Sequence, residues 1–406
     1  MTTTRQHRHR PAHHAIALRP LAIALLAAGL ASPALAVDYV WMGNGAGNWA
    51  DASRWSLLGV PGAGDTATLN NGNHEVVLTD ARSVGTLFLT QGYLGGSGSL
   101  NAGHASFGSA VLGRADSTQG TLNVSVNTSF AGANITSLRY GQVLSLQGDA
   151  TWTAGNGRIE VGQAYGGSAS ADPYRSSQLN IAAGTIFTDA GAAAAGGTKQ
   201  IGYDGGQVNN AGTYVRNGLG TTLGSYGFNN SGTVQVNAGT FGLTGNGSLR
   251  GQSSGQINVA SGATLLLGDA NITAGSINNS GRVLLSSGLA DVAAAAAING
   301  DWQITGSNAE LRLAGSHSIA TLAVTSGYLG GTAVLNTGSA SFVGGVLGRA
   351  DSTENTLNVS GSTSFAGANV TTLRHGQVLN LNGDANWTAG NDVMLWLPAR
   401  RSSALL

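Results

Sequence analysis

The chain of 406 residues has no cysteine, only 6 prolines, and 9% charged residues against 42% hydrophobic ones. Without cysteine, no disulfide can stabilise a small exported fold. The low charge and high apolar content exclude a charge-rich disordered chain. Stability must therefore come from a long, hydrogen-bonded and packed body.

Positive charge is scarce as well. Lys and Arg together number 19, equal to Asp and Glu, and Lys199 is the one lysine. Four arginines lie before residue 37 (Arg5, Arg8, Arg10 and Arg19), so the remainder has 15 basic and 19 acidic residues (19 − 4 = 15), a formal charge of −4 (15 − 19). Nucleic-acid binding needs a basic face, so no nucleic-acid partner is expected.

The first 36 residues predict a secretion signal. Arginines and no acids precede the apolar segment Leu21–Leu30, and Ala34-Leu35-Ala36 has the small-x-small form of a cleavage site. The alternative is a membrane anchor, but a bilayer span needs about 20 apolar residues. We therefore expect cleavage after Ala36, no membrane span afterwards, and an exported protein at the cell surface or outside the cell.

Glycine, by contrast, is abundant, with 64 residues. Short units recur: "NNAGTYV" begins at Asn209, "NNSGTVQV" at Asn229, "QSSGQINV" at Gln252 and "NNSGRVLL" at Asn278, at steps of 20, 23 and 26 residues (229 − 209, 252 − 229, 278 − 252). Each unit is a polar turn ending in Gly, followed by alternating apolar residues. Internal repeats with such a period are typical of solenoids.

The physics of this pattern predicts an all-β, parallel β-solenoid. Alternation sends one set of side chains inward, as in Val234/Val236, and the other outward. Gly and Asn suit sharp corners, and Asn residues at equivalent positions would stack into ladders. The alternative is a pair of antiparallel β-sandwiches joined by hairpins. Very little helix is expected after the signal peptide; the one candidate is Ala290–Ile298.

A larger duplication relates residues 83–156 to residues 318–391 at a constant offset of 235, with about 50 of the 74 paired positions identical. The duplicated block keeps its apolar residues and glycines, which indicates a conserved backbone path. We therefore divide the mature chain into 37–82, a Trp-rich cap and first coils, 83–317, a repeat block, and 318–391, a second copy of its start. Residues 392–406 form an atypical tail.

The hexapeptide "GRADST" occurs in both copies, with Arg114 and Asp116 in the first and Arg349 and Asp351 in the second. It can be interpreted as a duplicated catalytic site or as a duplicated corner of the coil. We favour the corner, because the whole surrounding block is duplicated rather than the charges alone.

Trp41, Trp49 and Trp55 lie within 15 positions of one another. Flat aromatic faces stack on sugar rings, so these residues are candidates for glycan contact. The first coil of a solenoid also has an open apolar end that bulky aromatics cover well. We favour the aromatic N-terminal cap.

The three tryptophans followed by Pro61 and Gly64-Asp65, together with the rows of "NNSGTV" units, resemble bacterial exported β-helix surface proteins. These include autotransporter passenger regions and Gly-rich repeat proteins of the PEP-CTERM kind. The resemblance implies a right-handed parallel β-helix outside the cell and carries over no catalytic residue. The chain departs from both groups at its end, which has neither a membrane barrel nor a Pro-Glu-Pro signal, so we interpret 392–406 as a truncated or out-of-frame ending.

Parallel β-helices also include polysaccharide-degrading enzymes, whose sites need clustered carboxylates, often with Ca²⁺. The acids here are scattered, and no Asp-x-Asp pair occurs. No catalytic, metal-binding or cofactor-binding residue is therefore predicted. We expect a non-enzymatic surface or matrix protein, structural or adhesive, with glycans or surface proteins as partners. The alternatives are a β-helix lyase or glycosidase, and a nonfunctional fragment of a longer gene.

Overall fold

The computed structural model describes residues 35–388 except 114–118, 133–134, 156, 163–176, 192–196, 203–204, 246–248, 350–354 and 368, and the side chains of 71 and 73. The predicted tail 392–406 lies outside this part of the chain, as does the predicted signal peptide up to residue 34. The described residues form a parallel β-solenoid, which confirms the predicted fold class. Their one helical element is a 3-10 turn, η1 (Ala52–Arg54), and they include no helix long and apolar enough to cross a bilayer.

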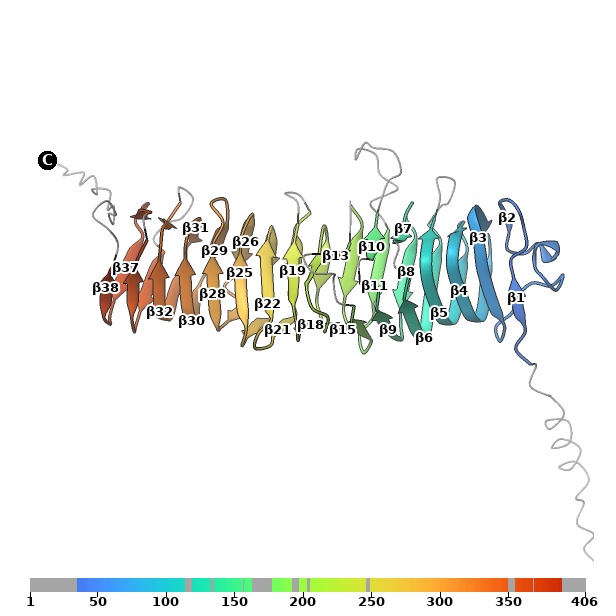
Figure 1. Cartoon of the computed structure of the whole chain (residues 1–406), viewed down its shortest axis with the longest axis horizontal. Helices are drawn as coiled ribbons and strands as arrows, with labels where there is room; N and C mark the ends of the chain where they lie inside the picture. Colours follow the sequence, from blue (N-terminus) through green and yellow to red (C-terminus); the bar gives the residue numbers. More distant parts are fainter. Residues whose placement is uncertain are drawn as a thin grey trace, which may run out of the picture. The chain divides into compact units, whose positions relative to one another are not determined.

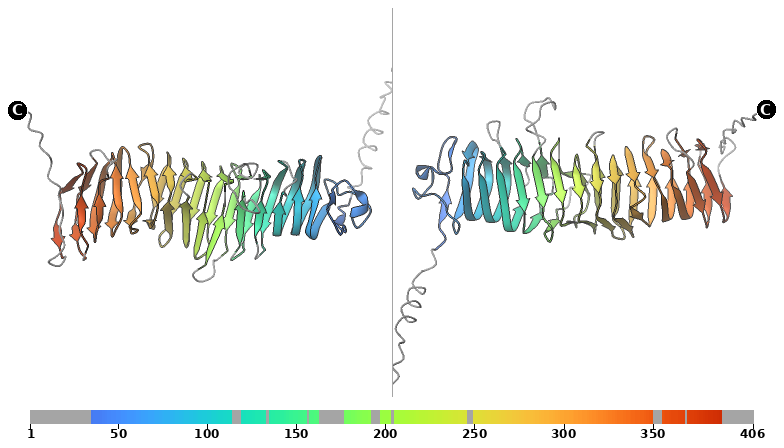
Figure 2. Two further views of the ribbon diagram at one scale, coloured as in Figure 1. Left: turned by 90° about the horizontal axis from the view of Figure 1, so that it is seen from above. Right: turned by 180° about the vertical axis from the view of Figure 1, so that it is seen from behind.

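Each turn of the coil carries strands on three faces, and the strands of each face stack in parallel along the axis (Figures 1 and 2). We call face 1 the ladder that begins with Asp38 beside Thr66, face 2 the one that begins with Gly47 beside Val76, and face 3 the one that begins with Ala81 beside Ser99. The pairings between named strands are all parallel, so the antiparallel sandwich alternative is wrong. The isolated bridge between Trp41 and Trp55 in the cap is the antiparallel exception among the described residues.

The strands group by face as follows. Strands that turn a corner and serve two or three faces are β3 (Thr66–Val77), β4 (Ala81–Gly95), β5 (Ser99–Leu112), β6 (Thr121–Phe130), β30 (Ser316–Val324) and β32 (Val334–Phe342). Face 1 also contains β1 (Asp38–Val40), β9 (Asp149–Trp152), β12 (Ile186–Asp189), β15 (Thr213–Arg216), β18 (Thr233–Val236), β21 (Gln256–Val259), β24 (Ser276–Asn279), β27 (Ala297–Ile298), β34 (Thr356–Val359) and β37 (Val378–Leu381). Face 2 contains β2 (Gly47–Asn48), β7 (Thr136–Leu138), β10 (Arg158–Val161), β13 (Thr198–Ile201), β16 (Thr221–Gly224), β19 (Thr240–Thr244), β22 (Thr264–Gly268), β25 (Arg282–Leu285), β28 (Asp301–Ile304), β35 (Thr363–Phe365) and β38 (Ala385–Trp387). Face 3 contains β8 (Val143–Leu146), β11 (Gln178–Ile181), β14 (Gln207–Asn210), β17 (Phe228–Asn230), β20 (Gly251–Ser253), β23 (Ala270–Ile272), β26 (Leu289–Val292), β29 (Glu310–Leu313), β31 (Tyr328–Gly331), β33 (Gly345–Leu347) and β36 (Thr371–Leu373).

The apolar interior follows from the alternation in the repeat units. Val234 and Val236 of β18 are buried, whereas Thr233 and Gln235 point outward. Val234 pairs in register with Ile257 of the next coil, so side chains of one kind stack along the axis. Each buried aliphatic side chain contributes about 1.5–3 kcal/mol, and repetition along the coil replaces a globular core.

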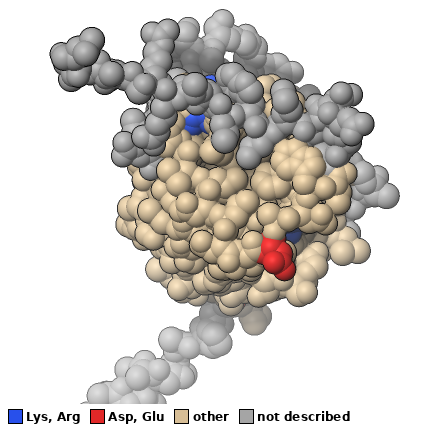
Figure 3. Space-filling model, turned by 90° about the vertical axis from the view of Figure 1, so that its left-hand side faces the viewer, with Lys and Arg blue, Asp and Glu red and all other residues tan. Residues whose placement is uncertain are grey.

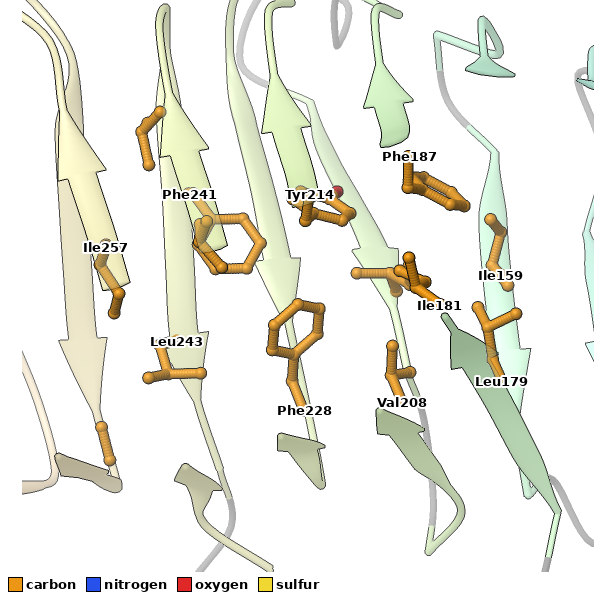
Figure 4. Close-up of a cluster of buried hydrophobic side chains, with 14 of the residues drawn as sticks. Ile159, Leu179, Ile181, Phe187, Val208, Tyr214, Phe228, Phe241, Leu243 and Ile257 are labelled. Atoms are coloured by element: carbon orange, nitrogen blue, oxygen red, sulfur yellow. The ribbon is translucent and has the colours of Figure 1, made fainter. Parts of the chain in front are cut away.

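Aromatic side chains stack in the same way within the interior. Phe187 and Tyr214 are register partners with ring centroids 5.3 Å apart and nearly parallel planes. Tyr214 also contacts Phe228 and Phe241, which come from faces 3 and 2 (Figure 4). Rings from all three faces therefore meet at this level and hold the faces together.

The predicted asparagine ladders are present on the outer surface. Asn229 Nδ2 donates to Asn209 Oδ1 at 3.0 Å, and Asn209 Nδ2 donates to Asn180 Oδ1 at 2.9 Å. On face 1, Asn278 Nδ2 donates to Asn258 Oδ1 at 2.9 Å. The side-chain amides of neighbouring coils are therefore hydrogen-bonded along the axis in the same register as the backbone.

The three N-terminal tryptophans form the cap. Their rings meet edge to face, with Trp55 5.1 Å from Trp41 and 4.9 Å from Trp49 between centroids, and Trp55 Nε1 donates to the Trp49 carbonyl oxygen at 2.9 Å. Trp41, Trp49 and Trp55 are 4%, 0% and 1% exposed. The alternative of a glycan platform on these rings is therefore wrong for this structure, because stacking on a sugar needs an exposed ring face.

The opposite end of the stack, which faces the viewer in Figure 3, leaves apolar side chains of its last strands partly exposed. Val378 and Leu381 of β37 and Trp387 of β38 are 38%, 39% and 43% exposed. Charged side chains are sparse on the described part of this end view. The two ends thus differ, because three buried indoles cover only the first one.

The helix candidate Ala290–Ile298 is not a helix. Its first residues belong to β26 and its last two form β27, with a turn closed by the Ala296 N–H donating to the Ala293 carbonyl oxygen at 3.0 Å. A single helical segment of nine residues is marginal by itself, whereas β26 pairs with strands on both sides and β27 pairs with β24.

The duplicated block repeats its backbone path, as its glycines show. Gly96 and Gly331, equivalent at the offset of 235, have φ of +104° and +105°. A Cβ at Gly331 would lie 2.0 Å from the Leu313 carbonyl oxygen, and one at Gly96 would lie 2.2 Å from that of Leu78. Both glycines are therefore required by the close approach of the neighbouring coil as well as by φ.

We predict that Trp55→Ala lowers the free energy of unfolding by about 3–5 kcal/mol, since a fully buried indole of the cap is removed. Trp387→Ala is the matched control, because its side chain is 43% exposed, and it should cost much less. Urea denaturation followed by circular dichroism measures both. Equal losses would contradict the assignment of Trp55 to a buried cap.

We predict that Gly331→Ala destabilises the protein more than Gly376→Ala does. Both glycines have positive φ, +105° and +75°, but a Cβ at Gly376 meets nothing within 4 Å. Gly376→Ala should cost only the backbone strain of about 1–2 kcal/mol, and Gly331→Ala should add a clash with the Leu313 carbonyl oxygen. Thermal unfolding of the two variants tests this order, which a similar midpoint for both would refute.

Candidate functional site

Two surface grooves stand out, and they are copies of one another. All eight residues that line the second groove correspond, at the offset of 235, to residues that line the first. The grooves have volumes of about 410 Å³ and about 490 Å³, within the range of ligand sites. The duplication therefore reproduces a concave surface as well as a backbone path.

Each groove lies where long strands bend from one face to the next. In the first copy β4 and β5 turn this corner at Gly85 and Gly103, and the register between β5 and β6 shifts after Ala102. Gly103 and its equivalent Gly338 have no side chain to fill the floor. A Cβ at Gly103 would lie 2.7 Å from the Gly85 carbonyl oxygen, so the close approach of the two coils at this corner depends on glycine.

Amide side chains form the walls. In the first groove Asn123 Nδ2 donates to Asn101 Oδ1 at 2.9 Å. In the second, Asn358 Nδ2 donates to Asn336 Oδ1 at the same distance, and Asn380, one coil further, donates to Asn358 Oδ1 at 2.8 Å. Each ladder amide has two donors and an acceptor with two lone pairs, so capacity remains for an external partner.

Hydroxyl groups complete the walls. Ser125 Oγ donates to the Ala102 carbonyl oxygen, and its equivalent Ser360 Oγ donates to that of Thr337, both at 3.3 Å. A hydroxyl that donates to the backbone in this way can still accept a hydrogen bond from a ligand.

The lining of both grooves is uncharged. It consists of Asn, Gln, Ser, Thr, Gly, Ala, Val and Ile residues, with no carboxylate, imidazole, amine or guanidinium group. Next to the first groove, Arg82 donates to both carboxylate oxygens of Asp80, and these hydrogen bonds hold the pKa of Asp80 below its usual value. This pair is neutral overall, so it adds no net charge beside the groove.

The two grooves lie on different faces of the coil. The strand segment with Asn101 belongs to face 3, whose ladder continues without a break to β36. The segment with Asn336 belongs to face 1, whose strands follow one another back through β30, β27 and β24 to β1, with β30 and β27 in contact and the others paired. Equivalent residues of the two copies therefore lie on adjacent faces of the coil, because the second copy is shifted by one strand position relative to the first.

The duplicated "GRADST" segment is described only in part. Arg114, Asp116 and Asp351 lie outside the described residues, so the expected Arg–Asp pairing is not placed. Arg349 follows Gly348, which has φ of +100°, and its Nη1 lies 2.5 Å from Glu310 Oε2. Its guanidinium also lies over the Tyr328 ring, 4.8 Å from the centroid.

Sequence reasoning missed Glu310 and its equivalent Glu75, which are 3% and 2% exposed. Both lie upstream of the segment that we aligned, yet they are separated by the same offset of 235. Extending the alignment by eight residues (83 − 75) would have found them. Glu310 pairs with Arg312 as well as Arg349, at 2.9 Å from Arg312 Nε, which is an arrangement that satisfies a buried carboxylate.

Among the described residues, no group of three or more His, Asp or Glu side chains is placed to hold a metal ion. The grooves are thus the concave sites whose chemistry is repeated, and they can donate and accept hydrogen bonds without charge. Comparisons of this chain with protein-family models, with curated proteins and with solved structures find no match.

Proposed function

We propose that the chain is an exported, non-enzymatic β-solenoid of the cell surface or extracellular matrix that binds neutral polysaccharides in its two grooves. The observation that carries this proposal is the duplicated groove with walls of amides and hydroxyls. Sugar hydroxyls both donate and accept hydrogen bonds, and so do the side chains of these walls. A hydroxyl-rich, uncharged polymer is therefore the class of ligand that fits the lining best.

The uncharged lining also argues against other polymers. A polyuronate or a nucleic acid needs cationic partners, and the chain has a single lysine and no Arg or Lys in either lining. Export is supported by the basic and apolar segment before residue 37.

The placement of the grooves on faces 1 and 3 favours bridging. A straight polymer that runs along one face meets only one groove, so two occupied grooves hold two polymer strands. Individual contacts of this kind are weak, and linking two of them raises the overall affinity by about 10²–10⁴-fold. The proposed role is therefore cohesion of a polysaccharide-containing matrix.

We predict that the protein binds neutral oligosaccharides at two sites and precipitates the corresponding polymer. Asn358→Ala should halve the stoichiometry in titration calorimetry and abolish precipitation, while Asn123→Ala with Asn358→Ala should weaken binding at least about tenfold, since ladder hydrogen bonds to the ligand are lost. The control is Asn209→Ala with Asn229→Ala, which removes a matched ladder outside the grooves and should leave binding unchanged.

Two results would contradict the proposal. Binding that survives in the groove double variant, or that falls equally in the control, would place the ligand elsewhere. Turnover of a polysaccharide that a chelator or a single Asp substitution abolishes would show an enzyme instead.

A further inference from the structure

Five polar side chains lie inside the solenoid at one corner between faces 1 and 2. Asp189, Lys199, Tyr214, Arg216 and Thr222 are each 0% exposed. Register pairs Asp189 with Arg216 and Lys199 with Thr222. Two consecutive coils thus bring together a carboxylate, the chain's only lysine, a guanidinium and two hydroxyls in an apolar interior.

The contacts converge on the Asp189 carboxylate. Lys199 Nζ lies 2.5 Å from Oδ1, and Arg216 Nη1 lies 3.2 Å from the same oxygen. The other oxygen, Oδ2, accepts hydrogen bonds from Thr222 Oγ1 at 2.7 Å and from Tyr214 Oη at 3.1 Å. Every oxygen of the carboxylate is therefore held, with the amine beside it.

Besides Asp189, Lys199 Nζ contacts an aromatic ring and a carbonyl oxygen. It lies 3.7 Å from the centroid of the buried Trp152 ring, whose face attracts a cation, and its hydrogen bond to the Gly191 carbonyl oxygen is long at 3.4 Å. Burial lowers the pKa of the Lys199 amine, and the attraction of Asp189 offsets this only in part. Burial thus makes the amine easier to deprotonate than an exposed lysine, and Asp189 Oδ1 is the nearest acceptor that the cluster offers.

Arg216, by contrast, keeps its charge without Asp189. Nη1 donates to the Gly191 carbonyl oxygen at 2.9 Å, and Nη2 donates to those of Leu219 and Gly220 at 2.6 Å and 3.3 Å. With two cations and one anion, the cluster has a charge of +1 (2 − 1). If Lys199 and Asp189 lost their charges together, the Arg216 guanidinium would remain, and it already donates to backbone carbonyl oxygens.

We propose that Lys199 and Asp189 condense to an intramolecular amide bond that cross-links two strands of one coil. The ammonium proton passes to Asp189 Oδ1, and the neutral amine attacks the carboxyl carbon. A second proton passes from the nitrogen to Oδ1, which leaves as water. One C–N bond forms and one C–O bond breaks, no electrons are exchanged with any other group, and no co-reactant is needed.

The cluster favours this step in three ways. The amine and the carboxyl group are held in contact, so their effective concentration is high and the condensation is faster than between free groups. The negative charge that develops on Oδ2 in the tetrahedral intermediate faces the hydroxyls of Thr222 and Tyr214, which already donate to that oxygen. The reaction also replaces two desolvated charges by a neutral amide, so the cost of burying the ion pair is removed.

The cross-link would close a loop that contains ten peptide bonds (199 − 189), between the end of β12 and the start of β13. It would be a covalent brace in a protein with no cysteine. It would join faces 1 and 2 of one coil, beside the contacts that Asp189 makes with Tyr214, Arg216 and Thr222 of the next coil.

Tryptic mapping of the purified full chain tests the proposal. Between Arg175 and Arg216 the only cleavage site is Lys199, and trypsin does not cut after an amidated lysine. The cross-linked protein gives a single peptide 176–216 with the sequence mass less one water. Peptides 176–199 and 200–216 at their full calculated masses would overturn the proposal.

Variants separate the bond from its surroundings. Asp189→Ala removes the carboxyl group and should restore full cleavage after Lys199, which controls for missed digestion. Thr222→Val removes a donor to Oδ2 and should lower the cross-linked fraction at least about twofold, whereas Thr221→Val, which changes the outward neighbour on the same strand, should match the wild type. Complete cross-linking in Thr222→Val would refute the role given to that hydroxyl.

Discussion

The parallel, in-register pairing of each coil with the next is the constraint on which the rest of this structure depends. It satisfies the backbone groups of short strands that would be unstable singly. It also places like residues above one another, so that aliphatics stack inside and asparagines stack outside. The same register carries the grooves, because a block that repeats its backbone path must repeat the surface built on it.

Residues whose roles follow from local pattern could be predicted from the sequence. The alternation in Val234/Val236 and the Asn-rich turns at Asn209 and Asn229 specify which side chains face inward and which form ladders, because period two and a short coil leave little choice. The cap was the favoured interpretation of the clustered tryptophans for a similar reason. Their burial then removed the glycan alternative, which depended on exposure that a sequence does not contain.

The groove and the buried cluster could not be predicted, because both depend on which coils become neighbours. Asp189 and Arg216 meet only through the register of β12 with β15, and the turns between units vary in length. A change in the length of one intervening loop that shifted this register would separate the two side chains. Likewise the offset of 235 identifies equivalent residues but not the face on which each copy lies, since that depends on every strand in between.

The pairing itself can be measured directly, because the chain has no cysteine and spin labels can be attached at introduced ones. Gln235 and Asn258 are outward-facing register partners on neighbouring coils, and Asn278 lies one coil further on the same face. Coils stack at about 4.8 Å, so labels at 235 and 258 should show strong dipolar broadening and labels at 235 and 278 clearly weaker broadening. Equal broadening for both pairs, or none for the first, would contradict the stacked parallel coil.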